Sequence, residues 1–206
     1  MSTRLTRGIA VLGASALWAA CAKGNKTADS TAAADSTAKA MAASPAPAPA
    51  PAPATLSDAN IFALLDEANA ADSSSGNMAS TKGTAADVKA FGREMMKDHH
   101  KLRADGQALA KKLNVTPTPP AGDSLPAMAQ RMTDKLTSTP KGADWDKAYI
   151  DGEVGAHQYV QSLLVTALGA AQDTSLKAAI TKAQPIVDSH LKKAQAIQTK
   201  LNAAKP

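Results

Sequence analysis

The sequence predicts an all-α fold: a four-helix bundle with a short extra helix between its second and third long helices. From Ser57 onward, apolar residues recur at the three- and four-residue spacing of amphipathic helices through four long stretches. No segment alternates apolar and polar residues as a half-buried strand would. Prolines and glycines separate the stretches, and four long helices in about 145 residues are typical of a bundle.

The first two long helices are each predicted to carry one stripe of core-facing residues. The first helix begins at the candidate N-cap Ser57 and ends near Gly83. The second begins at a predicted capping box formed by Thr84 and Asp87. The first stripe consists of Ile61, Leu65, Ala68, Asp72, Ser75 and Ala79, and the second of Val88, Phe91, Met95, His99, Leu102, Leu109 and Leu113.

The second half of the predicted bundle follows a proline-rich loop at residues 115–126. A short helix is expected over residues 125–136, before the breaker at residues 140–142. The third long helix spans about residues 144–171, and the fourth begins at Asp173 or Thr174. Because proline lacks the N–H that a helix requires, Pro185 is expected to kink the fourth helix.

Residues 1–20 are typical of a signal peptide. Arg4 and Arg7 precede an apolar stretch that is too short to span a membrane as a helix. The stretch ends in Leu17-Trp18-Ala19-Ala20-Cys21, which resembles a lipobox, although Trp18 occupies a position that is usually aliphatic. We therefore expect a diacylglyceryl anchor on Cys21 and an exported lipoprotein in the outer membrane, facing the periplasm or the cell surface. The alternative is a secretory peptide that leaves Cys21 as a free thiol.

Residues 21–56 are predicted to be the lipid-attachment cysteine and a disordered linker, and residues 57–206 the bundle domain. The linker is rich in Ala, Ser, Thr and Pro and has too few large apolar residues to form a core. Its Pro-Ala repeat favours polyproline II, a semi-rigid spacer. Cys21 is the only cysteine, so the chain has no internal disulfide or thiolate metal cluster.

The charge of the predicted bundle is close to balanced. Five of the 23 Lys and Arg residues and two of the 18 Asp and Glu residues precede Ser57, which leaves a net charge of +2 from there onward. The chain has no block of basic residues and only 3% aromatic residues for base stacking. The composition therefore excludes a nucleic-acid partner and leaves a membrane, reached through the lipid anchor, as the expected one.

Every long helix places a polar residue on or beside its core stripe. These residues are Asp72, His99, Glu153, His157 and His190. The three histidines lie about 15–18 residues from the nearer helix turn, so their depths differ by only a few Å at 1.5 Å per residue. Neutral imidazole with carboxylate or methionine ligands suits copper or zinc. The pattern predicts one mid-bundle metal site, with Met95 one turn from His99 as a further candidate ligand.

Two other interpretations of this polar layer remain open. Buried His and Asp side chains can hydrogen-bond one another and fix helix register in a structural or interaction protein that binds no ligand. An oxidoreductase with an unusual bundle-centred metal is the third possibility. A di-iron centre fits less well because Glu153 and His157 are four residues apart rather than three. No catalytic residue is predicted, and metal sequestration or stress tolerance in the envelope is favoured over an enzyme.

Several motifs resemble the domain-of-unknown-function family DUF4142 over residues 58–201. They are Asp87-Val88-Lys89-Ala90-Phe91, Met95-x-x-Asp98-His99, Trp145-Asp146-x-x-Tyr149, His157-Gln158, and Pro185 followed by His190. This resemblance implies a ferritin-like helical bundle of an exported or outer-membrane protein. Asp72 and Trp145 depart from the family pattern, which has Glu and Phe there. The Met-Met and His-His pairs of residues 95–100 are also similar to the copper-associated family DUF305, which favours copper among the metals.

Overall fold

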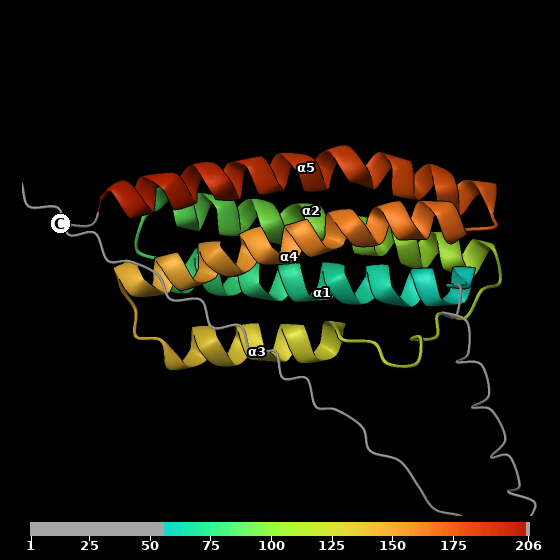
Figure 1. Ribbon diagram of the computed structural model, residues 1–206, viewed down its shortest axis with the longest axis horizontal. Coiled ribbons are helices and arrows are strands. Elements are labelled where there is room, and N and C mark those ends of the chain that lie inside the picture. Colours follow the sequence, from blue (N-terminus) through green and yellow to red (C-terminus); the bar gives the residue numbers. More distant parts are fainter. Residues whose placement is uncertain (1–55, 205–206) are drawn as a thin grey trace, which may run out of the picture. The chain divides into compact units, whose positions relative to one another are not determined.

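The computed structural model describes residues 56–204, which form five α-helices and no strand. Four long helices lie side by side, and a shorter helix packs on the outside against α1 and α4 (Figure 1). Their bounds are α1 Asp58–Lys82, α2 Ala86–Lys112, α3 Leu125–Ser138, α4 Ala143–Ala170 and α5 Thr174–Ala203. The predicted all-α bundle with a short extra helix is therefore confirmed.

The connectivity is that of a ferritin-like bundle. Helices α1 and α2 form one antiparallel hairpin, and α4 and α5 form the other (Figure 1). Between the hairpins, α3 returns along the bundle, so that α2 and α4 run in the same direction (Figure 1). One long crossover between two hairpins distinguishes ferritin-like folds from bundles that run up and down throughout.

The predicted N-terminal caps of α1 and α5 are present in the structure, and the predicted cap of α2 is not. Ser57 caps α1 in a capping box with Asn60, and Asp173 caps α5. The predicted capping box at the start of α2 is wrong, because Thr84 makes no cap to its own helix. Instead, the Asp146 carboxylate of α4 accepts hydrogen bonds from the backbone N–H groups of Thr84 and Ala85, at 2.8 and 2.7 Å. The Asp146 carboxylate thus fixes the turn that leads into α2.

Pro185 lies inside α5, which is continuous from Thr174 to Ala203. None of the described helices is both long and apolar enough to cross a membrane. The predicted signal peptide (residues 1–20), Cys21 and all but the end of the predicted linker lie outside the described residues.

The polar layer divides the core into two apolar clusters. One cluster lies toward the α4–α5 turn and contains Ile61, Leu164 and Ile180; the other lies toward the α1–α2 turn and contains Val88, Trp145 and Ile197. The polar residues fall between the two clusters on every long helix. They are Asp72 and Ser75 on α1, His99 on α2, Glu153 and His157 on α4, and His190 on α5, all of them buried.

Candidate metal centre

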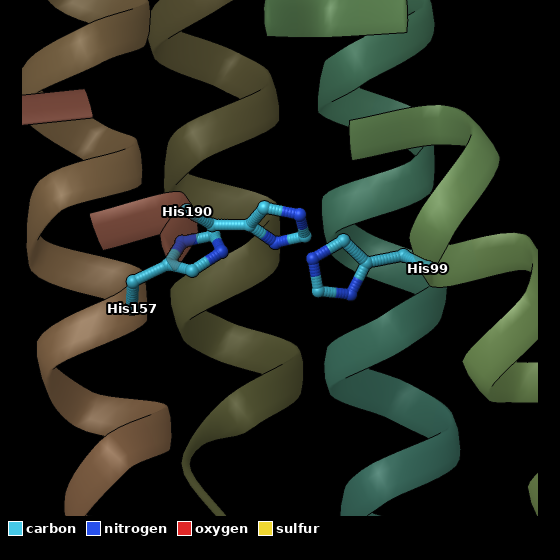
Figure 2. A group of neighbouring side chains, drawn as sticks. All are labelled: His99, His157 and His190. Carbon is cyan, nitrogen blue, oxygen red and sulfur yellow. The ribbon is translucent and has the colours of Figure 1, made fainter. Parts of the chain in front are cut away.

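Three imidazole rings from three different helices meet in the middle of the bundle. His99, His157 and His190 are each at most 2% exposed. Their ring centroids are separated by 5.6 Å (His99–His157), 5.2 Å (His99–His190) and 5.5 Å (His157–His190), which is nearly an equilateral triangle. Figure 2 shows one nitrogen of each ring turned toward the space between the side chains. The predicted convergence of the three histidines is therefore present in the structure.

The outward-facing nitrogen of each ring bonds to an acceptor that fixes its tautomer. His157 Nδ1 donates to the Glu153 carbonyl at 3.0 Å, and His190 Nε2 donates to Asp98 Oδ2 at 3.1 Å. His99 Nδ1 lies 2.8 Å from Asn69 Oδ1. The Asn69 amide nitrogen donates to the Leu65 carbonyl, so its oxygen is the atom that faces His99. All three partners are acceptors, and each of these nitrogens therefore carries the proton.

The inward-facing nitrogens are consequently lone-pair acceptors. They are His99 Nε2, His157 Nε2 and His190 Nδ1, and none has a hydrogen-bond partner in the described part of the chain. One ligand nitrogen from each ring lies within 4.8 Å of the others. Three acceptors cannot hydrogen-bond one another, and one water molecule has only two protons to donate. A metal cation, by contrast, accepts all three lone pairs at once.

The size of the triangle matches a transition-metal ion. The point equidistant from the three centroids lies about 3.1 Å from each of them. A metal–nitrogen bond of 2.0–2.1 Å, extended by the ring radius, puts zinc about 3.2 Å from an imidazole centroid. The outer acceptors complete the pattern, because metal-bound imidazoles almost always donate their other N–H to a carbonyl or carboxylate.

The electrostatics of the layer keep these imidazoles neutral at pH 7. Burial, with repulsion from the other two rings, lowers the pKa of His99 to about 2. Burial and His190 together lower the pKa of His157 to about 4. The pKa of His190 is also lowered by burial, although Asp98 opposes the shift. Because a metal binds the deprotonated ring, no proton has to leave these side chains first.

Two carboxyl groups lie beside the imidazoles. Asp72 Oδ2 is 3.6 Å from His99 Nδ1, and Glu153 Oε2 is 3.5 Å from His157 Nδ1. Burial raises the pKa of Asp72 to about 7, and burial together with Asp72 raises the pKa of Glu153 well above its usual range. Asp72, Glu153 and His157 also offer donor atoms within 4.8 Å of one another. Both predicted carboxylates are therefore next to the histidines.

Two cavities lead to this layer. One, of about 990 Å³, is lined by Asp72 and His99 among mainly apolar residues of the four long helices. The other, of about 690 Å³, lies between α1, α3 and α4 and is lined by Asp72 and Glu153. Asp72 thus borders both cavities, and small solutes can approach the layer past its carboxyl group.

The remaining candidate ligands are placed differently. Met95 is fully buried in the apolar cluster with Val88 and Phe91, toward the α1–α2 turn. His100, the neighbour of His99, is exposed and lies near the Ser73 hydroxyl and the Met96 carbonyl. Cys21 lies outside the described residues.

The sequence reasoning missed the side chains that orient the rings. Asn69 lies on no predicted core stripe, and Asp98 belongs only to one of the family motifs. The position of Asp98 is informative, because consecutive residues of a helix point about 100° apart. When His99 faces the core, Asp98 therefore lies at the edge of the core stripe, where it reaches His190 of the neighbouring helix α5. Nothing in the sequence pattern distinguished Asn69 from the other polar residues of α1.

Comparison with known proteins identifies a family and nothing closer. The family model described as a domain of unknown function (DUF4142) matches residues 26–197. No curated protein matches the chain, and no solved structure matches it.

Proposed function

The chain belongs to the DUF4142 family, and from that premise we propose that its bundle binds a transition-metal ion through His99, His157 and His190. Copper is the preferred ion and zinc the second choice. The protein is an exported lipoprotein that holds this ion in the cell envelope, for metal sequestration or stress tolerance, and it is not proposed to be an enzyme.

The observation that carries this proposal is the convergence of three unpartnered nitrogens on one buried point. A layer that served only helix register would pair its polar groups with one another. Here the outward-facing nitrogen of each imidazole is hydrogen-bonded, and the inward-facing nitrogen has no partner among the described residues. Leaving a buried acceptor unsatisfied costs about 1–3 kcal/mol, so three of them in one place favour a ligand over a purely structural role.

The donor set supports copper and zinc over other ions. Imidazole nitrogen suits copper, zinc, iron and nickel, and affinities for a given site rise through the divalent series to copper. Magnesium and calcium prefer oxygen ligands. The similarity of residues 95–100 to a copper-associated family also favours copper over zinc. The three nitrogens leave a tetrahedral ion one further position, which a water molecule can take.

Placement in the envelope is proposed from the N-terminal residues. A charged start, a short apolar stretch and small residues before Cys21 support export and lipid attachment. The anchor gives the bundle a membrane as its partner and keeps it at the outer membrane. No nucleic-acid partner is proposed, because the bundle has a near-balanced charge and few aromatic residues.

Calorimetric titration of the metal-free chain, purified without an affinity tag, tests the proposal. Copper or zinc at neutral pH is expected to give saturable heat. Bound metal also raises the free energy of unfolding, by about 2.7 kcal/mol when free metal exceeds the dissociation constant a hundredfold. His99→Ala, His157→Ala and His190→Ala each weaken binding sharply.

His100→Ala is the matched control, because His100 is the exposed neighbour of His99 on the same helix. This variant is expected to bind as the wild type does. Absence of saturable binding to the wild-type chain, or equal loss in His100→Ala and His99→Ala, contradicts the proposal.

A further inference from the structure

Asp72 and Glu153 form a pair of buried carboxyl groups that the three-imidazole site does not need. Asp72 comes from α1 and Glu153 from α4. One oxygen of each lies within 4.8 Å of the other and of a nitrogen of His157. His157 therefore belongs both to this group and to the imidazole triangle, and the two groups are neighbours.

One oxygen of the pair has no hydrogen-bond partner among the described residues. Ser75 donates a 2.7 Å hydrogen bond to Glu153 Oε1, but Glu153 Oε2 has no partner among residues 56–204. The buried Tyr149 hydroxyl, from one turn earlier on α4, lies beside the Glu153 carboxyl group and can donate to it. Buried polar atoms are nearly always paired, and a carboxylate oxygen accepts more than one bond, so Glu153 can take a further positive or hydrogen-bonding group.

The surrounding charge points to a cation. Among the described residues, no lysine or arginine forms an ion pair with Asp72 or Glu153; their only charge-capable partners are His99 and His157. Two ionised carboxylates in one buried space without a counter-charge are strongly disfavoured, so the metal-free pair keeps a proton. A divalent cation that replaces this proton compensates both charges.

We propose that a second divalent cation binds between Asp72 and Glu153, beside the ion held by the imidazoles, so that the centre is dinuclear. This inference rests on the proposed function, because His157 adjoins both positions. The carboxylate oxygens suit a harder ion such as Mn²⁺, and they also accept zinc at about 2.0–2.2 Å. The cavity of about 690 Å³, which both carboxyl groups line, provides a route from solvent.

Stoichiometry and magnetic coupling test this proposal on the metal-free full chain, kept in mild detergent. Cu²⁺ is added stepwise and followed by calorimetry and electron paramagnetic resonance. The first equivalent gives the spectrum of an isolated copper ion with nitrogen ligands. The second equivalent is expected to bind next to it, which broadens that spectrum and produces the half-field signal of two coupled copper ions.

Glu153→Gln and Asp72→Asn keep the shape of each side chain and remove its charge. Either variant is expected to lose the second equivalent and the half-field signal, while the affinity for the first changes less than about tenfold. Asp188→Asn is the control, because the Asp188 carboxylate on α5 accepts a hydrogen bond from Gln161 and belongs to none of the groups of converging donor atoms in the described residues. It is expected to keep both equivalents.

The possible failures are distinguishable without relying on any variant. A wild-type chain that binds one equivalent overturns the second position and leaves the three-imidazole site intact. Two equivalents without magnetic coupling, or a second equivalent that persists in Glu153→Gln, also overturn it, since the second ion then lies elsewhere. A wild-type chain that binds no copper contradicts this inference and the proposed function together.

Discussion

At the scale of single residues, the centre depends on hydrogen bonds that orient otherwise free rings. Asp98 holds His190 so that its Nδ1 atom faces the other two imidazoles. Asn69 holds His99 so that its Nε2 atom faces them. An imidazole that loses such a partner can rotate or change tautomer, and its lone pair then points away from the ion. The affinity of the site is therefore expected to depend on residues that never touch the metal.

Replacement of Asp98 tests this dependence. Asp98→Ala removes the acceptor for His190 Nε2, and metal affinity is expected to fall about 10- to 100-fold. Asp98→Asn keeps an acceptor oxygen and retains more of the affinity. Asp105→Ala, which removes an exposed carboxylate paired with Lys101 on the same helix, is the control. Equal affinities for the wild type and Asp98→Ala would show that His190 is not held by this bond.

Asp72 makes the stability of the metal-free protein depend on pH. Burial raises its pKa from 3.8 to about 7, so between these values the folded protein holds a proton that the unfolded chain releases. The stabilisation from this group is present below pH 4 and is lost as the pH rises toward 7. The full effect is on the order of 4 kcal/mol, at about 1.4 kcal/mol per pH unit.

Denaturant unfolding of the metal-free wild type and Asp72→Asn at pH 4.5, 6 and 7.5 measures this effect. The variant is expected to gain stability relative to the wild type as the pH rises. The buried imidazoles act in the opposite sense, losing stability below about pH 6.5, but they are present in both proteins. A stability difference that is constant with pH would contradict the raised pKa.

At the scale of elements, the α1–α2 hairpin brings the two helices into very close contact. A Cβ atom at Gly76 would lie 2.7 Å from the Gly92 carbonyl oxygen, and one at Gly92 would lie 2.6 Å from Ala79 Cβ. Only glycine allows this approach, which sets the distance between the helix that carries Asn69 and the helix that carries His99. The orientation of the His99 ring thus depends on two residues that have no side chain.

Gly92→Ala is expected to destabilise the bundle by about 1–3 kcal/mol, because the added methyl group meets the packed atoms of α1. Gly106→Ala, on the same helix, is the control. Among the described residues, no atom lies within 4 Å of a Cβ at Gly106, and alanine in an open helical position stabilises by up to about 1 kcal/mol. Thermal or denaturant unfolding measures both changes, and equal effects would contradict the close packing.

The stripes of His99, His157 and His190 could be predicted because helical periodicity fixes both the face and the depth of a residue. Two further features depend on contacts between distant segments, which periodicity does not contain. Thr84 fits a local capping pattern, yet its hydrogen bonds go to Asp146, 62 residues away. Asn69 faces His99 only because the glycines let the two helices approach. The tautomers of His99 and His190 depend on such contacts and could not be predicted, whereas His157 donates to a carbonyl of its own helix.

At the scale of the whole molecule, one folded bundle is proposed to be tethered through Cys21. Mass spectrometry of the membrane fraction is expected to find a diacylglyceryl-modified Cys21 at the mature N-terminus. Cys21→Ser abolishes the modification and moves the protein out of the membrane fraction, while the metal affinity of the bundle does not change. An unmodified mature wild-type chain that begins at another residue contradicts the lipoprotein proposal.

The position of the bound ion tests the central claim most directly. Crystals of the copper-loaded chain, with diffraction data collected on either side of the copper absorption edge, locate the ion without reference to any model of the site. We expect an anomalous peak about 2.0–2.1 Å from His99 Nε2, His157 Nε2 and His190 Nδ1. Copper found only at His100 or elsewhere on the surface, with no peak between the three rings, would contradict the account.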